Sequence, residues 1–304
     1  MKKTHLIELL NNIKSTIVSF ISVILFVCLS VAIYTGVSWM TTNISLSIDR
    51  VMKDSNYRDS EIIFTYGFSD DDLKEIKEID DNLEIEAYKS TYEFFDYQSS
   101  KLQALVYETP KSVDTLISMD GKLPIKDNEI GIDSYFAENY NYKIGDVIKF
   151  NENISSLTNI NSLLDYDIEN GDFNSIELDG KEQFLKNREF VVTCIFKTPR
   201  LLISSEGNYV YSPLNNQIVN AYMIVNSNAF NNNAYTGYTN ILIRNHNYDV
   251  YSTYDDEYDD SMDAFSDVLN NKIKNIVNNK NQEIKNKKDE APVPVLHLRI
   301  RLIF

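Results

Sequence analysis

Residues that commonly build metal and disulfide sites are scarce in this sequence. Among 304 residues there are three histidines and two cysteines. His5, His246 and His297 lie in three different settings, so the sequence predicts no zinc cluster. Cys28 lies in an apolar run and Cys194 lies far away in a strand-like stretch, so we expect no disulfide between them.

Motifs of the common catalytic classes are also missing. The chain has no GxSxG nucleophile motif, no HExxH zinc motif and no GxxxxGK(S/T) phosphate loop. The acidic stretch DYDIENGD at 165–172 has carboxylates at alternate positions, but Ile176 stands where a calcium loop has glutamate. We therefore expect no catalytic, cofactor-binding or metal-binding residues. We also expect that the chain is not an enzyme and does not hydrolyse ATP itself.

Glycine and proline, at nine and six residues, are too few for a linker-rich or fibrous chain. The hydrophobic share of 43% is enough for a packed core. Positive charge is scarce as well. Residues 1–40 and residues 291–304 each carry a net charge of +2, which leaves −20 on residues 41–290, given −16 for the whole chain. Such an acidic surface repels phosphate backbones, so no nucleic acid partner is expected.

What the chain does have is one long apolar run near its N-terminus. Residues 17–39 contain no charge, and as a helix at ~1.5 Å per residue they reach about 35 Å, enough for a ~30 Å hydrocarbon core. The run is longer than the apolar region of a signal peptide and lacks a small-x-small cleavage site, which favours an uncleaved transmembrane helix. The span is expected to include Ile17, Phe20, Leu25, Phe26, Leu29, Tyr34 and Trp39.

Charge on the two sides of this run predicts its orientation. Lys2, Lys3 and Lys14 precede the apolar run, and acidic residues dominate after it. By the positive-inside rule, the N-terminus is expected in the cytoplasm and residues 41 onward on the outer side of the cell membrane. The lipid bilayer is thus the first expected partner.

The first fourteen residues carry a second signal. Leu6, Leu9, Leu10 and Ile13 recur at the spacing of one helix face. Two interpretations stay open. The helix lies in the cytoplasmic interface of the bilayer, or it is a coupling helix that docks a cytoplasmic partner.

The remaining sequence predicts a mixed α+β domain over residues 41–290, with a polar, loop-rich insertion at 151–188. A helical stalk is expected at 41–57, and Ser69 should cap a helix that has Asp70, Asp71 and Asp72 in its first turn. Further helices are expected at 133–140 and about 252–288, the latter with Ala264, Val268, Ile273 and Val277 on its apolar side. Strands are expected at 61–66, 84–97, 101–107, 146–150, 189–196, 220–225 and 239–244.

The last residues, 291–304, do not fit this pattern. APVPVLHLRIRLIF is too short to span a bilayer and brings two arginines into an apolar run. We expect an atypical tail that neither spans the membrane nor continues the outer domain, as at a truncated gene. The expected division is therefore 1–14 amphipathic helix, 15–40 transmembrane helix, 41–290 outer domain and 291–304 tail.

Three stretches resemble the N-terminal part of the FtsX/MacB-type ABC transporter permeases. Residues 6–37 are similar to the family's amphipathic first helix and first transmembrane helix, and EFVVTCIFKTPRLLI at 189–203 is similar to a strand that leads into a proline turn. The most specific stretch is 120–150, where the family has a G-x-x-P, NEI, D and KIGD run. The matching residues are Gly121, Pro124, Asn128, Glu129, Ile130, Asp133, Ala137, Ile144, Gly145 and Asp146.

The resemblance implies an extracytoplasmic α+β domain of the MacB periplasmic-core type, held by the first transmembrane helix. It also implies an ATP-binding cassette ATPase as partner, whose motion is relayed to the outer domain for export or for release of lipoproteins or peptides. The family has further transmembrane helices, which this sequence lacks. A second permease copy or the missing permease half is therefore a further expected partner.

Two other functions remain open at this stage. A single-span cell-surface sensor or ligand-binding protein would use the outer domain to bind its ligand, but it should carry a signalling or wall-binding element. An extracytoplasmic enzyme would need a catalytic constellation. Neither feature is evident in the sequence.

Overall fold

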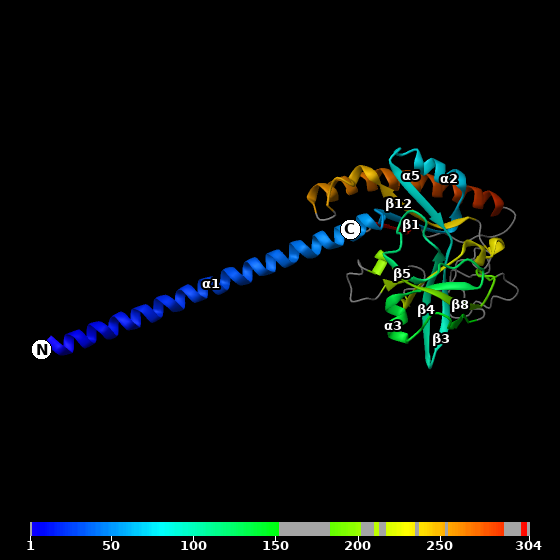
Figure 1. Cartoon of the computed structure of the whole chain (residues 1–304). Coiled ribbons are helices and arrows are strands. Elements are labelled where there is room, and N and C mark those ends of the chain that lie inside the picture. Colours follow the sequence, from blue (N-terminus) through cyan, green and yellow to red (C-terminus); the bar gives the residue numbers. More distant parts are fainter. Residues whose placement is uncertain are drawn as a thin grey trace, which may run out of the picture. The chain divides into compact units, whose positions relative to one another are not determined.

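The computed structural model describes residues 2–151, 183–201, 210–212, 217–234, 237–252, 255–288 and 299–302. The chain divides into two units, Met1–Arg50 and Val51–Phe304. The second is called the α+β unit below. Figure 1 shows the elements of both units along the chain.

The first unit consists of helix α1 (Lys2–Asp54), which continues for its last residues into the α+β unit. Its part from Ser19 onward is long and apolar enough to cross a membrane, with a mean hydropathy of 2.4 in its best window. Ser30 and Thr35 donate their hydroxyl groups to the carbonyls of Phe26 and Val31 at 2.8 Å, so these polar groups are satisfied within the helix. The seven residues predicted for the span lie in α1 with exposed fractions of 51% to 76%. These are the features of a membrane-spanning helix.

The α+β unit begins with a four-stranded antiparallel sheet in the order β13-β1-β12-β2. Alternate side chains of β1 and β12 face helices α2 and α5, which lie together on one face of the sheet (Figure 1). Ile62 and Ile241 are register partners there, and both are fully buried. The bounds are β1 Ser60–Phe68, α2 Asp70–Lys77, β2 Leu83–Tyr88, β12 Tyr238–Asn245, α5 Asp256–Lys288 and β13 Arg299–Leu302.

Helix α2 begins where the sequence predicts. The Ser69 hydroxyl accepts from the Asp72 amide at 3.3 Å, and Asp72 accepts from the Ser69 amide at 2.6 Å, so the two form a capping box. Ile76 is buried and Leu73 and Ile79 pack beside it, as the spacing of three indicates. The prediction for this helix is confirmed.

The apolar face of α5 differs from the predicted one. Ile273 and Val277 are buried, but Ala264 is exposed and Val268 is 53% exposed. Ala264 and Val268 each stand one position before a buried residue, and one position rotates a side chain by about 100° around a helix. The buried face comprises Tyr258, Met262, Phe265, Leu269, Ile273, Ile276 and Val277.

A seven-stranded mixed sheet forms the rest of the α+β unit, with the path β3-β4-β11-β6-β8-β5 and β7 paired to β8. A bridge between Phe95 of β3 and Phe150, the residue after β7, brings the two sides of this sheet together, as in a small barrel. The bounds are β3 Ser90–Tyr97, β4 Ser100–Glu108, β5 Ser118–Gly121, β6 Glu129–Asp133, α3 Ser134–Tyr140, β7 Val147–Lys149, β8 Glu189–Lys197 and β11 Ala221–Val225. β9 (Val210–Tyr211) and β10 (Ile218–Val219) pair with each other as a separate two-stranded sheet. The short 3-10 helices are η1 Pro199–Leu201, η2 Ser227–Ala229, η3 Asn232–Ala234 and η4 His246–Tyr248.

Aromatic rings fill the interior of this second sheet. Phe95 packs edge-on against Phe136 of α3 and against Phe150, at centroid distances of 5.7 and 6.0 Å. Phe150 in turn contacts Phe190 of β8 at 5.6 Å. All four rings are at most 1% exposed. They belong to a hydrophobic cluster that shares no residue with the cluster beneath α2 and α5.

Two sequence-based expectations are wrong, and a third concerns residues outside the described part of the structure. The expected strand 84–97 is two strands that break at Lys89, because β2 joins the first sheet and β3 the second. Residues 299–302 of the tail form β13 and pair with β1, since alternating arginines and apolar residues also suit an edge strand. Residues 152–182, which contain most of the predicted insertion and the acidic stretch 165–172, lie outside the described residues.

Candidate functional site

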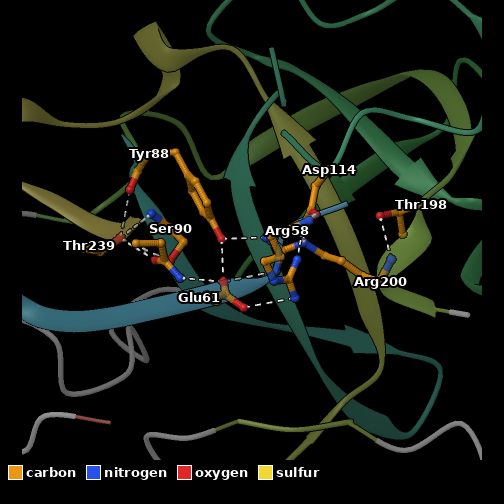
Figure 2. A network of polar contacts seen from close by, with 9 residues as sticks. Arg58, Glu61, Tyr88, Ser90, Asp114, Thr198, Arg200 and Thr239 are labelled. Carbon is orange, nitrogen blue, oxygen red and sulfur yellow. Dashed lines mark hydrogen bonds and ion pairs between the residues drawn. The ribbon is translucent and has the colours of Figure 1, made fainter. Parts of the chain in front are cut away.

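The most unusual feature of the α+β unit is a buried ionic network between its two sheets. It is built around Glu61 of β1, two arginines (Arg58 and Arg200) and Asp114 of the 109–117 loop, with Tyr88 at the end of β2 (Figure 2). We call these five residues the joint network. Arg58 lies four residues after the end of α1, and Arg200 lies in η1 after β8.

The two arginines and the two carboxylates of the joint network neutralise one another. Arg58 contacts Asp114 and lies 3.1 Å from the second oxygen of Glu61. Arg200 lies 3.3 Å from both Glu61 and Asp114. Every one of these side chains is less than 9% exposed. Because the network has two charges of each sign, removal of any one of them leaves one unit of buried charge without a counter-charge.

Tyr88 and neighbouring rings complete the network. The Tyr88 hydroxyl donates to Glu61 at 2.8 Å and accepts from Arg200 at 2.8 Å. The guanidinium carbon of Arg200 also lies 5.0 Å from the ring centroid of Tyr107 and 5.7 Å from that of Tyr88, within the range of cation–π contacts. Two carboxylates, a hydroxyl and two aromatic rings around Arg200 therefore favour its charge, against burial and the like charge of Arg58.

The electrostatics fix the charge state of Glu61. Burial alone would raise the pKa of Glu61, but Arg200 and Arg58, with hydrogen bonds from Tyr88 and Asn240, lower it to about 2. The folded pKa thus lies below the ordinary value of 4.5. The stabilisation from this carboxylate is complete above pH 4.5 and is lost as the pH falls toward 2.

A second buried group joins the start of β1 to α5. Asp59 accepts from Arg244 of β12 at 2.6 Å, from the Asn245 amide at 2.6 Å and from the Tyr258 hydroxyl at 2.8 Å. Tyr258 lies in the first turn of α5. One carboxylate therefore connects the segment after α1 with the helix that follows the last central strand.

The 109–117 loop holds the two residues that come directly after α1. The amides of Asp114 and Thr115 donate to the carbonyls of Asn56 and Ser55 at 3.0 and 2.8 Å. The loop is itself fixed, because Glu86 of β2 accepts from the amides of residues 111, 112 and 113 at 2.8 Å each. Residues 55–61 are thus bound to a loop, two strands and a helix.

The charged side chains of the joint network are engaged with one another in ion pairs. Its carboxylates are paired with arginines, which stay protonated in proteins, so the network offers no free acid, base or nucleophile. Within the described residues, no group of three or more His, Cys, Asp or Glu side chains is arranged to hold a metal ion.

The residues that carry the NEI…D…KIGD motif lie in or beside β5, β6, α3 and β7. Asp133 caps α3 by accepting from the Phe136 amide at 2.8 Å, and its other oxygen accepts from the Tyr222 amide at 2.7 Å. Glu129 and Asp146 accept backbone amides at turns, from Ile125 and Lys143 among others. Gly121 and Gly145 adopt φ angles of +91° and +99°, which favour glycine. The motif therefore encodes turns and caps rather than a binding site.

The joint network was not among the residues that sequence analysis selected. The predicted coupling residues Leu6, Leu9, Leu10 and Ile13 lie in α1, and their side chains are outside the described part of the structure. The signal that could have revealed the network is a charged residue within or beside a strongly apolar strand. Glu61 stands in EIIF and Arg200 in PRLLI.

Comparisons with known proteins find similarity in structure but not in sequence. No protein-family model matches the chain, and no curated protein matches it. Among solved structures, the chain is similar to the extracellular domain of the noncanonic ABC-type transporter YknZ from Gram-positive bacteria. The two share 10% sequence identity with a TM-score of 0.30, over 62% of this chain and 83% of that chain.

Proposed function

We propose that the chain is a membrane subunit of an FtsX/MacB-type ABC transporter permease, and that it relays ATP-driven motion of a partner ATPase to an outer domain. One observation carries the proposal. The helix that contains the apolar run ends at Asp54, and the next seven residues are built into buried ionic contacts that also hold α5. The motif at 120–150 supports the same family.

A relay of this kind needs contacts between the connected segments that persist when one segment moves. A displacement of residues 55–58 pulls on the 109–117 loop through backbone hydrogen bonds and on β1 through the Arg58–Glu61 pair. Asp59 passes the same displacement to Tyr258 at the start of α5. Discrete rearrangement of such packed elements is how small shifts become larger domain movements.

The chain performs no chemistry of its own in this proposal. Its sequence contains no phosphate loop, so hydrolysis belongs to the partner ATPase, and the amphipathic face of residues 6–13 is the proposed contact with it. The outer domain then acts in export or in release of a lipoprotein or peptide. A second permease copy or the missing permease half completes the membrane part.

The proposal requires the α+β unit to lie outside the cell membrane. In a Cys28→Ser, Cys194→Ser background, Val250→Cys should react with an impermeant thiol reagent on intact cells, because Val250 is 79% exposed. Asn12→Cys should react only after the cells are opened, because the positive-inside rule puts the N-terminus in the cytoplasm. Labelling of Asn12→Cys alone on intact cells would reverse the orientation.

The function itself is tested by purification of the full chain from membranes in a mild detergent. We expect an ATP-binding cassette ATPase to copurify and the sample to hydrolyse ATP in a vanadate-sensitive manner. A chain prepared in the same way without hydrolysis or a bound ATPase would contradict the permease proposal and favour a single-span sensor.

A further inference from the structure

His246, the first residue of η4, lies between two carboxylates. Its Nδ1 atom is 2.8 Å from Asp249, and its Nε2 atom is 3.0 Å from Glu84 of β2. Both ring nitrogens therefore face acceptors at hydrogen-bond distance. A neutral imidazole has one N–H group, so it can satisfy only one of the two contacts. The imidazolium has two N–H groups and satisfies both.

The two carboxylates reach different parts of the α+β unit. Glu84 also accepts from the side-chain amide of Asn56 at 2.7 Å, and Asn56 follows α1 by two residues. Asp249 also contacts Arg244 of β12 through its other oxygen. His246 thus joins the segment after α1, through Glu84, to the connection between β12 and α5.

We propose that His246, Glu84 and Asp249 form a pH-dependent latch, which closes when the imidazole is protonated and holds the chain after α1 to the chain before α5. The latch is distinct from the joint network, whose arginines keep their charge at every physiological pH. Its existence does not depend on the proposed function. Only its effect on transport output rests on that function.

The charged groups around His246 come from four elements. β2 contributes Glu84, the residues after η4 contribute Asp249, and β12 contributes Arg244, which is already engaged by Asp59 and Asp249. From the loop before β2, Asp80 accepts the side-chain amide of Asn247 at 2.6 Å, next to His246. The acids outnumber the single arginine, so the local field favours the imidazolium.

The sign of the pH dependence follows from these contacts. The hydrogen bond with Asp249 raises the pKa of His246 above its ordinary 6.5, burial opposes the rise, and Glu84 adds to it. Since the folded pKa is raised, the latch is complete below pH 6.5 and is lost as the pH rises through the folded pKa.

The direct test is histidine-selective NMR of the full chain in nanodiscs. The chain has three histidines, so three signals must be resolved. The signal lost in His246→Gln assigns the residue. We expect Glu84→Gln and Asp249→Asn each to lower the titration midpoint of His246. A midpoint that neither variant lowers would overturn the latch. The two variants act on different ring nitrogens, so one suffices if the other does not fold.

Hydrogen exchange gives a second readout that requires no ATPase. After correction for intrinsic rates, amides of residues 246–252 should be several-fold better protected at pH 6 than at pH 8.5 in the wild type. His246→Gln should abolish this difference, whereas His5→Gln should leave it unchanged. Equal pH dependence in all three chains would contradict the proposal, whether or not the chain proves to be a permease subunit.

Discussion

Arg200→Ala should lower the free energy of unfolding of the α+β unit by about 3–5 kcal/mol, the usual cost of breaking a buried ion pair from one side. Arg200 is 8% exposed and is a charged partner of both Glu61 and Asp114. Its removal leaves two buried carboxylates with Arg58 as their remaining cation. The variant also loses the contacts with the rings of Tyr88 and Tyr107.

Urea unfolding of the full chain in detergent, followed by near-UV circular dichroism of its 20 tyrosines, measures this effect. The single tryptophan, Trp39, lies in α1 and does not report on the α+β unit. Lys126→Ala is the matched control, because Lys126 is 75% exposed in its pair with Glu129 and should cost at most about 1 kcal/mol. Equal losses for the two variants would show that the joint network does not hold the sheets together.

Leu9→Lys should weaken attachment of the partner ATPase by roughly thirtyfold, which corresponds to the ~2 kcal/mol of apolar burial that the leucine contributes. The face formed by Leu6, Leu9, Leu10 and Ile13 has no other function in the proposal. ATP hydrolysis that copurifies with the full chain should fall accordingly. Asn12→Lys is the matched control, since it adds the same charge to the same helix on the polar face.

Retention of the ATPase by Leu9→Lys would show that this face binds the bilayer interface rather than a partner. A loss in both variants would indicate that added charge, not the apolar face, causes the effect. In that case the amphipathic pattern would not be a coupling element.

Much of the fold follows from local rules that a single sequence displays. The capping box at Ser69 and Asp72 places α2, and alternating or continuous apolar runs place β1, β8, β11 and β12. These signals act over a few residues, so the elements can be predicted without knowledge of the tertiary contacts. The apolar run of α1 is equally local, and its length and composition alone make it a candidate membrane span.

The features that could not be predicted depend on distant pairing. No glycine or proline near Lys89 marks the point where the chain leaves one sheet for the other, because LEIEAY before it and STYEFFDY after it both suit a strand. The joint network brings together residues 58, 61, 88, 114 and 200, and although Glu61 and Arg200 stand out beside apolar residues, nothing in the sequence pairs them with one another. Only the packing of two sheets gives them partners, and so only the structure identifies them as a site.

The relay can be measured most directly by hydrogen exchange of the full chain purified with its ATPase, compared between ADP and ATP with vanadate. We predict that exchange changes in residues 55–61, 246–252 and 255–258, where the segments after α1 and before α5 meet. Strand β11, whose five residues are all buried in the second sheet, should stay unchanged as an internal control. If the ATPase turns over while no segment of the α+β unit changes its exchange, the chain does not relay motion and the proposed function is wrong.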